Sequence, residues 1–196
     1  HPGDLACGKT VQLNTETSSH LIRVLRTKVN SQVTLFNGDG YDYNCKTLNN
    51  NARKTLLTVN SRIETDRESN LHITLIQGLS RHERMEYSIQ KSVELGVNRI
   101  IPVICNRSNT RLNEDRQNKK IAHWNKVIIS ACEQSGRSVI PELTDISILE
   151  NITPVLNTHS LKLALNPEAV TRLKEIYNVQ DADSVKYVEI FIGPEG

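Results

Sequence analysis

The sequence lacks the patterns that mark membrane, secreted and zinc-binding proteins. None of its 196 residues falls in an apolar run close to the roughly 20 that a membrane helix needs, and no signal-peptide pattern is present. The four cysteines are scattered, without a C-x-x-C pair. This spacing argues against a metal site and favours reduced thiols in the cytoplasm. The chain does not begin with methionine, so we expect its natural N-terminus to lie upstream.

The common fingerprints of nucleotide-binding and hydrolytic enzymes are also missing. There is no G-x-G-x-x-G, no G-x-x-x-x-G-K-[ST], no G-x-S-x-G and no metal-ligand pair of histidines. A dinucleotide or nucleoside-triphosphate enzyme of the ordinary kind is therefore disfavoured. The six histidines are dispersed, which is typical of surface and helix positions.

Charge is distributed unevenly along a chain whose net charge is only +2. Residues 81–137 carry 11 basic and 6 acidic side chains, whereas residues 138–196 carry 4 basic and 9 acidic ones. A basic middle section favours contact with a polyanion there. An ordinary solvent-exposed face explains the same pattern, so charge alone does not decide.

Residues 1–68 have the pattern of a small β-barrel. Short alternating segments surround an Asn-Gly-Asp-Gly turn, which is a strong hairpin signal. The expected strands are 33–36, 41–48 and 54–63. One short helix interrupts them, with Ser18 or Ser19 as its cap and Leu21, Ile22, Val24 and Leu25 as its apolar residues.

A polar linker at 66–70 separates this part from residues 71–196, where strands and helices alternate. The expected strands are 71–79, 99–105, 161–165 and 187–192, and the expected helices are 83–95, 118–135 and 167–177. Alternation of this kind indicates an α/β domain with a mostly parallel sheet.

Polar residues follow several of these strands. Loops after parallel strands meet at one edge of the sheet, so Arg81, Arg107 and the 193–196 loop should lie together. Gln90 and Glu94 are one helical turn apart and can form a hydrogen bond. Arg137 follows the end of the long helix. It should therefore lie away from this edge of the sheet, unless the chain doubles back. Each of these residues also has an ordinary structural explanation.

The last residues lead an apolar strand into a loop of two glycines, a proline and a glutamate. Such a junction is typical of the ligand-binding edge of an open α/β sheet. A domain is not expected to stop at this point, so we expect residues 71–196 to be an incomplete domain.

Four sequence blocks carry a family resemblance. Residues 20–26, 84–97, 131–137 and 192–196 resemble, in order and spacing, the ribosomal RNA small-subunit methyltransferase E family. The resemblance implies an α/β fold of the SPOUT class, with a PUA-like barrel preceding a trefoil-knotted domain that forms a homodimer. It also implies methylation of N3 of a uridine in small-subunit ribosomal RNA, with S-adenosylmethionine as cofactor. The family's pattern continues with a helix and a further motif that completes the knot and the pocket, and neither is present here. We therefore expect residues 1–196 by themselves neither to form a complete knot nor to hold the cofactor well.

The resemblance also suggests roles for individual residues. We expect Arg107 and Arg137 to stabilise the developing uridinate or to bind phosphate. Glu195 can accept the N3 proton, or simply bond the backbone of its own loop. The expected cofactor contacts are Leu165, Asn166, Gly193 and Gly196. The expected RNA contacts are Arg23 and Arg26, three apart on one helix, together with Arg81, Arg84 and Lys91.

Two other readings remain open. A SPOUT enzyme could act on a ribose 2′-hydroxyl or on transfer RNA with the same fold. Alternatively, the chain could be a non-catalytic RNA-binding module in which the α/β part only dimerises. The expected partner is small-subunit ribosomal RNA, free or in the assembled subunit, and no membrane.

Overall fold

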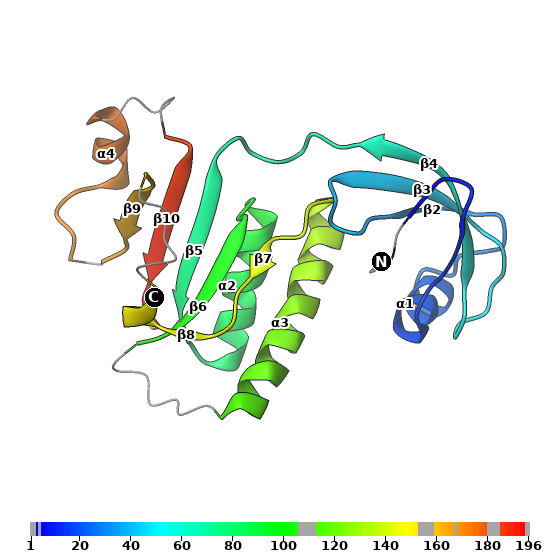
Figure 1. Cartoon of the computed structure of the whole chain (residues 1–196), viewed down its shortest axis with the longest axis horizontal. Coiled ribbons are helices and arrows are strands. Elements are labelled where there is room, and N and C mark those ends of the chain that lie inside the picture. The colour runs from blue at the N-terminus through cyan, green and yellow to red at the C-terminus, as the bar shows by residue number, and fades with distance from the viewer. Residues whose placement is uncertain are drawn as a thin grey trace. The chain divides into compact units, whose positions relative to one another are not determined.

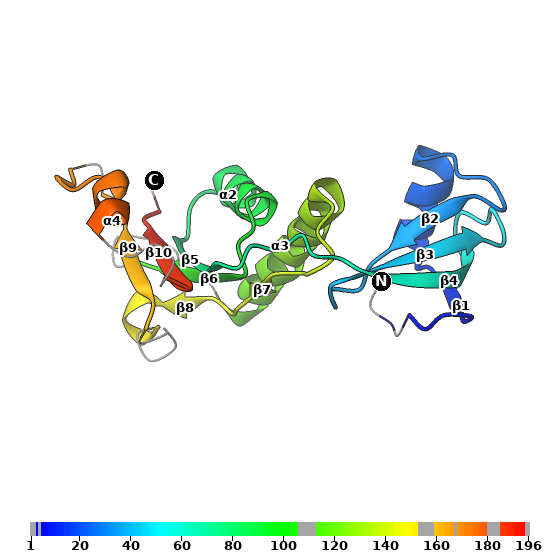
Figure 2. The ribbon, with the colours of Figure 1, turned by 90° about the horizontal axis from the view of Figure 1, so that it is seen from above.

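The computed structural model describes residues 3, 5–105, 113–152, 159–166, 168–179 and 185–194. The chain divides into two compact units (Figures 1 and 2). The first is His1–Arg67 with Arg137–Ile140, and the second is Glu68–Gly136 with Pro141–Gly196. The sequence pattern did not predict that Arg137–Ile140 groups with the first unit, because it assigned 71–196 to one continuous domain.

The first unit is built on an antiparallel sheet with the strand order β1-β4-β3-β2. Its strands are β1 (Thr10–Gln12), β2 (Gln32–Leu35), β3 (Tyr41–Thr47) and β4 (Leu56–Glu64). The hairpin between β2 and β3 is confirmed, and Gly38 and Gly40 in its turn have φ values of 98° and 85°, which favour glycine. Leu57 and Cys45 lie fully buried in the core of this unit.

The helix of this unit begins earlier than the sequence pattern predicted. It consists of α1 (Thr15–Ser19) followed by a π-helical turn, η1 (His20–Val24). Asn14 is its cap, because the Asn14 side chain accepts a hydrogen bond from the Thr17 backbone at 2.8 Å. The predicted cap at Ser18 or Ser19 is wrong. Ser18 is buried, and its hydroxyl accepts a hydrogen bond from the backbone of Thr55 at 3.0 Å.

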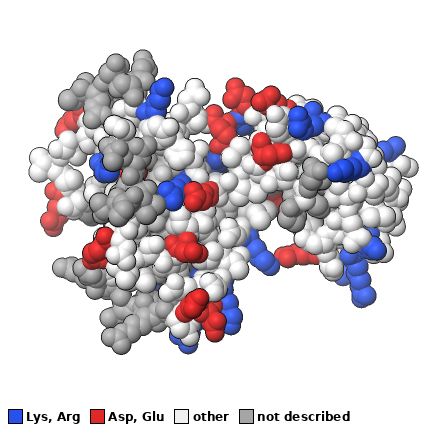
Figure 3. Space-filling view, viewed as in Figure 1, with Lys and Arg blue, Asp and Glu red and all other residues white. Residues whose placement is uncertain are grey.

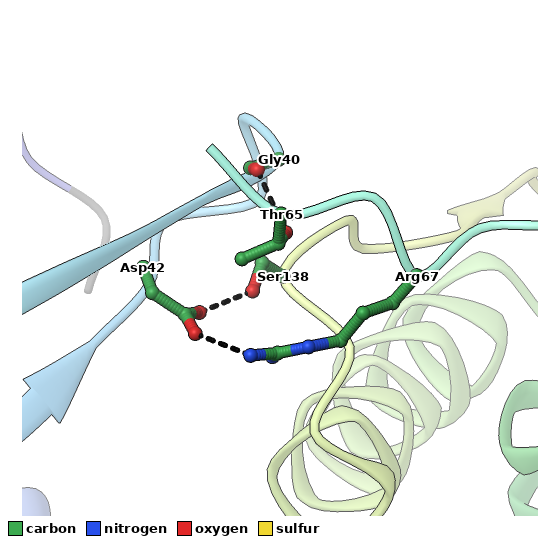
Figure 4. A network of polar contacts seen from close by, with 5 residues as sticks. All are labelled: Gly40, Asp42, Thr65, Arg67 and Ser138. Carbon is green, nitrogen blue, oxygen red and sulfur yellow. Dashed lines mark hydrogen bonds and ion pairs between the residues drawn. The ribbon is translucent and has the colours of Figure 1, made fainter. Parts of the chain in front are cut away.

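A polar network in the first unit joins β3 to two segments that lead into or out of the second unit (Figure 4). Asp42 accepts one hydrogen bond from the Ser138 hydroxyl and another from Arg67 Nη2 at 2.9 Å. Thr65 donates its backbone N–H and its hydroxyl to the Gly40 carbonyl, at 3.0 and 2.8 Å. The Gly40 N–H in turn donates to the Ser138 carbonyl at 3.2 Å. Residues 40–42, at the start of β3, therefore hold both the segment that contains Thr65 and Arg67 and the segment that contains Ser138.

The second unit contains a parallel sheet with the order β7-β6-β5-β10-β9, in which β8 also pairs with β6. Its strands are β5 (His72–Gly78), β6 (Arg99–Ile104), β7 (Glu142–Leu143), β8 (Ser147–Ile148), β9 (Leu161–Ala164) and β10 (Tyr187–Ile192). Every described pairing is parallel, which confirms the predicted sheet. The two-residue strands β7 and β8 were not predicted, because they are too short to show a period.

Two of the helices of this unit, α2 and α3, lie side by side in both ribbon views (Figures 1 and 2). The helical elements are α2 (His82–Glu94), α3 (Glu114–Ser135), the 3₁₀ turn η2 (Leu149–Asn151) and α4 (Leu173–Val179). Met85, Ile89 and Val93, which are spaced four residues apart in the predicted helix 83–95, form the fully buried face of α2. The predicted first residues of the other two helices were less accurate. Helix α3 begins four residues before the predicted residue 118, and α4 begins six residues after the predicted residue 167.

The described side chains on the face shown in Figure 3 are of mixed charge, with acidic and basic groups interspersed. The positive balance of residues 81–137 therefore does not form one continuous basic area on the described part of that face. None of the helices in the described part of the chain is both long and apolar enough to cross a membrane.

Candidate active site

The carboxyl edge of the parallel sheet brings three loops together (Figure 1). The register pairs Ile192 of β10 with Gln77 of β5, and Phe191 of β10 with Ala164 of β9. The residues that follow these three strands are therefore neighbours along one edge. Open α/β sheets bind their ligands at such an edge.

Three of the four predicted cofactor residues lie at this edge. Leu165 donates its backbone N–H to the Phe191 carbonyl at 3.0 Å, which extends β9 alongside β10. Its side chain is 55% exposed. Asn166 follows and accepts a hydrogen bond from the Glu168 backbone at 3.0 Å, while Gly193 leaves β10 beside it. Gly196 lies outside the described residues.

Gly78 is a structural requirement of the site that the sequence analysis did not single out. A Cβ atom at position 78 would lie 2.7 Å from the Pro194 nitrogen and 2.9 Å from the Gly193 carbonyl carbon. Only glycine allows this approach of backbone to backbone. The available signal was a glycine at the end of an apolar strand, which often marks close backbone contact.

Gln77 is buried and holds together the backbone of Gly78 and Gly193. Its side chain is only 3% exposed, and Nε2 donates to the carbonyls of Gly78 and Gly193 at 3.1 and 3.3 Å. The ends of β5 and β10 are thereby joined by one buried amide. The loop that carries Gly193 is held from the β5 side by Gln77 and Gly78 together.

A cavity of about 470 Å³ opens between this loop and α2. It is lined by Gln77, Ser80, Glu83, Arg84, Tyr87, Ser88, Ile192, Gly193 and Pro194. Among the described atoms, Gln77 Oε1 and the Ser80 hydroxyl are buried without a hydrogen-bond partner. The site therefore combines a backbone loop, two buried polar atoms and an arginine.

The three predicted RNA contacts around α2 have different surroundings. Arg81 caps the helix through its main chain and is exposed, and the exposed Arg84 lines the cavity. Lys91 instead pairs with Glu94, at 2.6 Å between Nζ and Oε2. This hydrogen bond raises the pKa of Lys91. Glu94 thus takes a lysine as its partner, where the spacing had suggested Gln90.

The two predicted RNA contacts of the first unit do not share a helix. Arg23 lies in η1, but Arg26 lies beyond its end with a φ of 54°. The prediction that they lie three apart on one helix is therefore wrong. Both are exposed, and so are the apolar side chains between them, Val24 at 64% and Leu25 at 60%.

Two of the three predicted catalytic residues, Arg107 and Glu195, lie outside the described part of the chain. Arg137 is described and is 6% exposed. It follows Gly136, whose φ of 71° ends α3, and it groups with the first unit and not with the residues of the carboxyl edge. The catalytic roles of all three remain predictions.

Comparison with known families gives an independent assignment. Residues 67–196 match the family described as RNA methyltransferase domain, and residues 13–46 match the RNA methyltransferase PUA domain. The first match covers the whole of the second unit and well over half of the chain. The fold has the mixed α/β architecture of SPOUT methyltransferases with a PUA-like domain.

Individual proteins agree with this assignment. Ribosomal RNA small subunit methyltransferase E from Neisseria gonorrhoeae, solved with S-adenosyl methionine, is 33% identical with a TM-score of 0.87, and the match covers 97% of this chain and 77% of that one. A putative methyltransferase from Legionella pneumophila, solved with the same cofactor, is 37% identical with a TM-score of 0.89 and coverages of 100% and 78%. Ribosomal RNA small subunit methyltransferase E from Buchnera aphidicola of Acyrthosiphon pisum is 28% identical over 98% of this chain and 74% of its own length. The chain belongs to the ribosomal RNA small subunit methyltransferase E family of RNA methyltransferases.

Proposed function

We propose that this chain methylates N3 of a uridine in small-subunit ribosomal RNA, with S-adenosylmethionine as the methyl donor. The observation that carries the proposal is the meeting of Leu165, Asn166 and Gly193 at the carboxyl edge of the sheet. Two relatives of the same fold, 33% and 37% identical, are described as bound to this cofactor.

The residues at the edge fit such a cofactor. Leu165 offers an exposed apolar side chain that can cover one face of an adenine. Gly193 is exposed, and a Cβ built on it meets no atom within 4 Å, so its backbone is open to a ligand. Asn166 adds an exposed amide beside them. When bound, the cofactor supplies an electrophilic methyl group on a sulfonium.

The protein must also activate the base. The N3–H of uracil is a weakly acidic imide, so N3 is a poor nucleophile until its proton leaves. In this proposal, Glu195 accepts that proton, and Arg107 or Arg137 stabilises the negative charge that develops on the ring. Arg81 and Arg84 are exposed near the same edge, where their charges suit RNA phosphates.

The two units divide these tasks in the proposal. Residues 1–68 bind RNA with Arg23 and Arg26, and residues 71–196 carry the methyl transfer. We further propose a homodimer in the cytoplasm, on the strength of the family resemblance. Light scattering coupled to size-exclusion chromatography tests the dimer directly, and a monomeric mass at all concentrations would reject it.

Primer extension on small-subunit ribosomal RNA is the experiment that tests the reaction. A methyl group on N3 blocks the pairing edge of uracil, so reverse transcriptase stops beside it. The stop should disappear when the full-length gene is deleted and return when the purified full-length protein and S-adenosylmethionine are added. Digestion of the product to nucleosides separates N3-methyluridine from a ribose-methylated product. If the full-length protein binds the RNA but shows no heat or stability shift on adding S-adenosylmethionine, that result would favour a non-catalytic module.

A further inference from the structure

We propose that Asp42 is a positioning residue for Arg137, so that the β2–β3 hairpin of the first unit holds in place an arginine that serves methyl transfer. This inference rests on the proposed function, in which Arg137 stabilises the developing charge or binds phosphate, and it adds the structure that fixes this arginine. The two residues are far apart in the chain. Both nevertheless belong to the first unit, because Arg137–Ile140 groups with His1–Arg67.

The backbone immediately before Arg137 is set by the end of α3. Gly136 has a φ of 71°, and its N–H donates to the Cys132 carbonyl. A left-handed glycine with this bond ends a helix and gives the following residue a defined direction. Arg137 therefore continues from an ordered helix end.

The backbone immediately after Arg137 is held by the start of β3. The Ser138 hydroxyl donates to Asp42, and the Ser138 carbonyl accepts the Gly40 N–H at 3.2 Å (Figure 4). The side chain and the main chain of Ser138 are thus both bonded to the same hairpin. The residue that follows Arg137 has no freedom to turn without breaking one of these bonds.

The next two residues pack on the turn of the hairpin. Val139 forms isolated β-bridges with Gly38 and Asp39. A Cβ atom at position 38 would lie 3.1 Å from Ile140 Cδ1, so the Ile140 side chain lies against the Gly38 backbone. Three consecutive residues after Arg137 are therefore held by one hairpin.

Asp42 provides the acceptor on which this arrangement depends. Ser138 is 2% exposed, so water has little access to its hydroxyl and cannot replace Asp42 as the acceptor. Arg67, which is half exposed, donates to the other carboxylate oxygen of Asp42 at 2.9 Å. The bond to Ser138 is thus the buried link between hairpin and segment, and the pair with Arg67 is its exposed counterpart.

A fixed arginine is what stabilisation of a developing anion requires. Arg137 is 6% exposed, so water screens its charge only weakly. A preorganised positive charge in such surroundings lowers the energy of an anionic transition state more than a solvated one does. The benefit depends on position, since a displacement of about 1 Å can cost roughly a hundredfold in rate. The first unit would therefore contribute to the reaction as well as to RNA binding.

Kinetics of variants of the full-length protein test this role, at a temperature where circular dichroism shows each one folded. We expect Asp42→Ala and Ser138→Ala to lower kcat for methyl transfer about tenfold and to leave KM for S-adenosylmethionine unchanged. Asp42→Asn should keep most of the wild-type kcat, because its amide oxygen can still accept the Ser138 hydroxyl. Arg67→Ala is the matched control, since it removes the other partner of Asp42 and leaves the Ser138 bond. Equal kcat values for Asp42→Ala and Arg67→Ala would overturn the inference.

A double-mutant cycle shows whether Asp42 acts through Arg137. If it does, Asp42→Ala should not lower the residual kcat of Arg137→Ala any further, because the group that Asp42 positions has already been removed. A general loss of structure would instead lower kcat by the same factor in both backgrounds. Effects that multiply would therefore overturn the inference, even in a protein that methylates normally.

Nuclear magnetic resonance separates this inference from the reaction itself. In full-length protein with isotopically labelled arginine, the Nε–H signal of Arg137, assigned by its loss in Arg137→Ala, should be protected from exchange with water. Asp42→Ala should remove this protection, and Arg67→Ala should not. Unchanged protection in Asp42→Ala would overturn the inference whatever the activity. Protection that depends on Asp42, in a protein that transfers no methyl group, would retain the positioning of Arg137 and reject the proposed function.

Discussion

Gly78 lies directly against Pro194, and a Cβ atom at position 78 would be 2.7 Å from the Pro194 nitrogen. Real Cβ atoms essentially never approach another heavy atom so closely. The contact joins residues that are far apart in the chain, at the ends of the neighbouring strands β5 and β10. It therefore sets how near the Gly193 loop comes to β5, and with it the shape of the candidate active site.

The substitution Gly78→Ala should disturb this loop. The added methyl group meets backbone atoms of Gly193 and Pro194, which cannot move aside as a flexible side chain could. Overpacking of this kind costs about 1–3 kcal/mol in the free energy of unfolding. We expect a lower melting temperature and weaker binding of S-adenosylmethionine. Wild-type values for both would show that the loop has room to shift.

The substitution Gly193→Ala is the matched comparison. A Cβ at this position meets no atom within 4 Å, so the melting temperature should stay at the wild-type value. Binding of S-adenosylmethionine should nevertheless fall, because the methyl group occupies space that the proposed cofactor needs. Calorimetry and thermal melting of the same preparation separate these effects. Unchanged affinity would remove Gly193 from the cofactor site.

The sheet and the α2 core were predictable because their signals are local. Apolar runs followed by polar loops identified β5, β6, β9 and β10, and the four-residue spacing of Met85, Ile89 and Val93 identified the buried face of α2. The predicted helix ends at 95 and 135 agree with the structure to within one residue, because Gly96 and Gly136 follow them in the left-handed conformation that ends helices.

The errors arose where tertiary contacts override local preference. Ser18 looks like a helix cap, but the fold buries it to bond the Thr55 backbone, 37 residues away. Arg26 continues an apparent helix in sequence, but a left-handed backbone ends the helix before it. Gly193 could be identified from the sequence because it lies in a glycine-rich loop. Gly78 could not, because it is critical only through its contact with Pro194, which is far from it in the sequence.

Arg26 occupies a backbone conformation that favours glycine. Its φ is 54°, and the left-handed region costs a non-glycine residue about 1–2 kcal/mol. We expect Arg26→Gly to leave the free energy of unfolding unchanged or to raise it by up to about 1 kcal/mol, since glycine's greater unfolded-state entropy offsets part of the gain. RNA affinity should fall at the same time. A loss of stability with unchanged RNA affinity would show that the arginine serves folding alone.

Salt dependence tests the phosphate contacts of the first unit. Each phosphate contact contributes about 0.7–0.9 to the slope of log affinity against log salt concentration. Replacing Arg23 and Arg26 with alanine should therefore reduce that slope by about 1.5 and weaken RNA binding at every salt concentration. The control replaces Arg53 and Lys54, which are also adjacent exposed cations of this unit. Equal slopes for the two double variants would remove Arg23 and Arg26 from the RNA site.

Asp42 should hold the segment that contains Ser138 in place (Figure 4). The Ser138 hydroxyl is buried, and removing its acceptor by Asp42→Ala leaves it unpaired at a cost of about 1–3 kcal/mol. Arg67 is half exposed, so Arg67→Ala should cost less than about 1 kcal/mol. Hydrogen exchange at the Gly40 amide, which donates to the Ser138 carbonyl, reports this segment directly. Full protection of that amide in Asp42→Ala would contradict the assignment.

Cys45 should make the stability of the protein fall at alkaline pH. Its side chain is fully buried, and this burial, reinforced by the nearby Cys7, raises its pKa from 9.0 to about 11. The folded state then keeps a proton that the unfolded chain releases, so the free energy of unfolding decreases as pH rises above 9. The decrease attributable to Cys45 should approach roughly 2 kcal/mol near pH 11. Urea unfolding of wild type and Cys45→Ala across this range isolates that contribution, because the lost packing of the smaller side chain is independent of pH. Parallel stability curves for the two proteins would mean that the buried thiol does not titrate on unfolding.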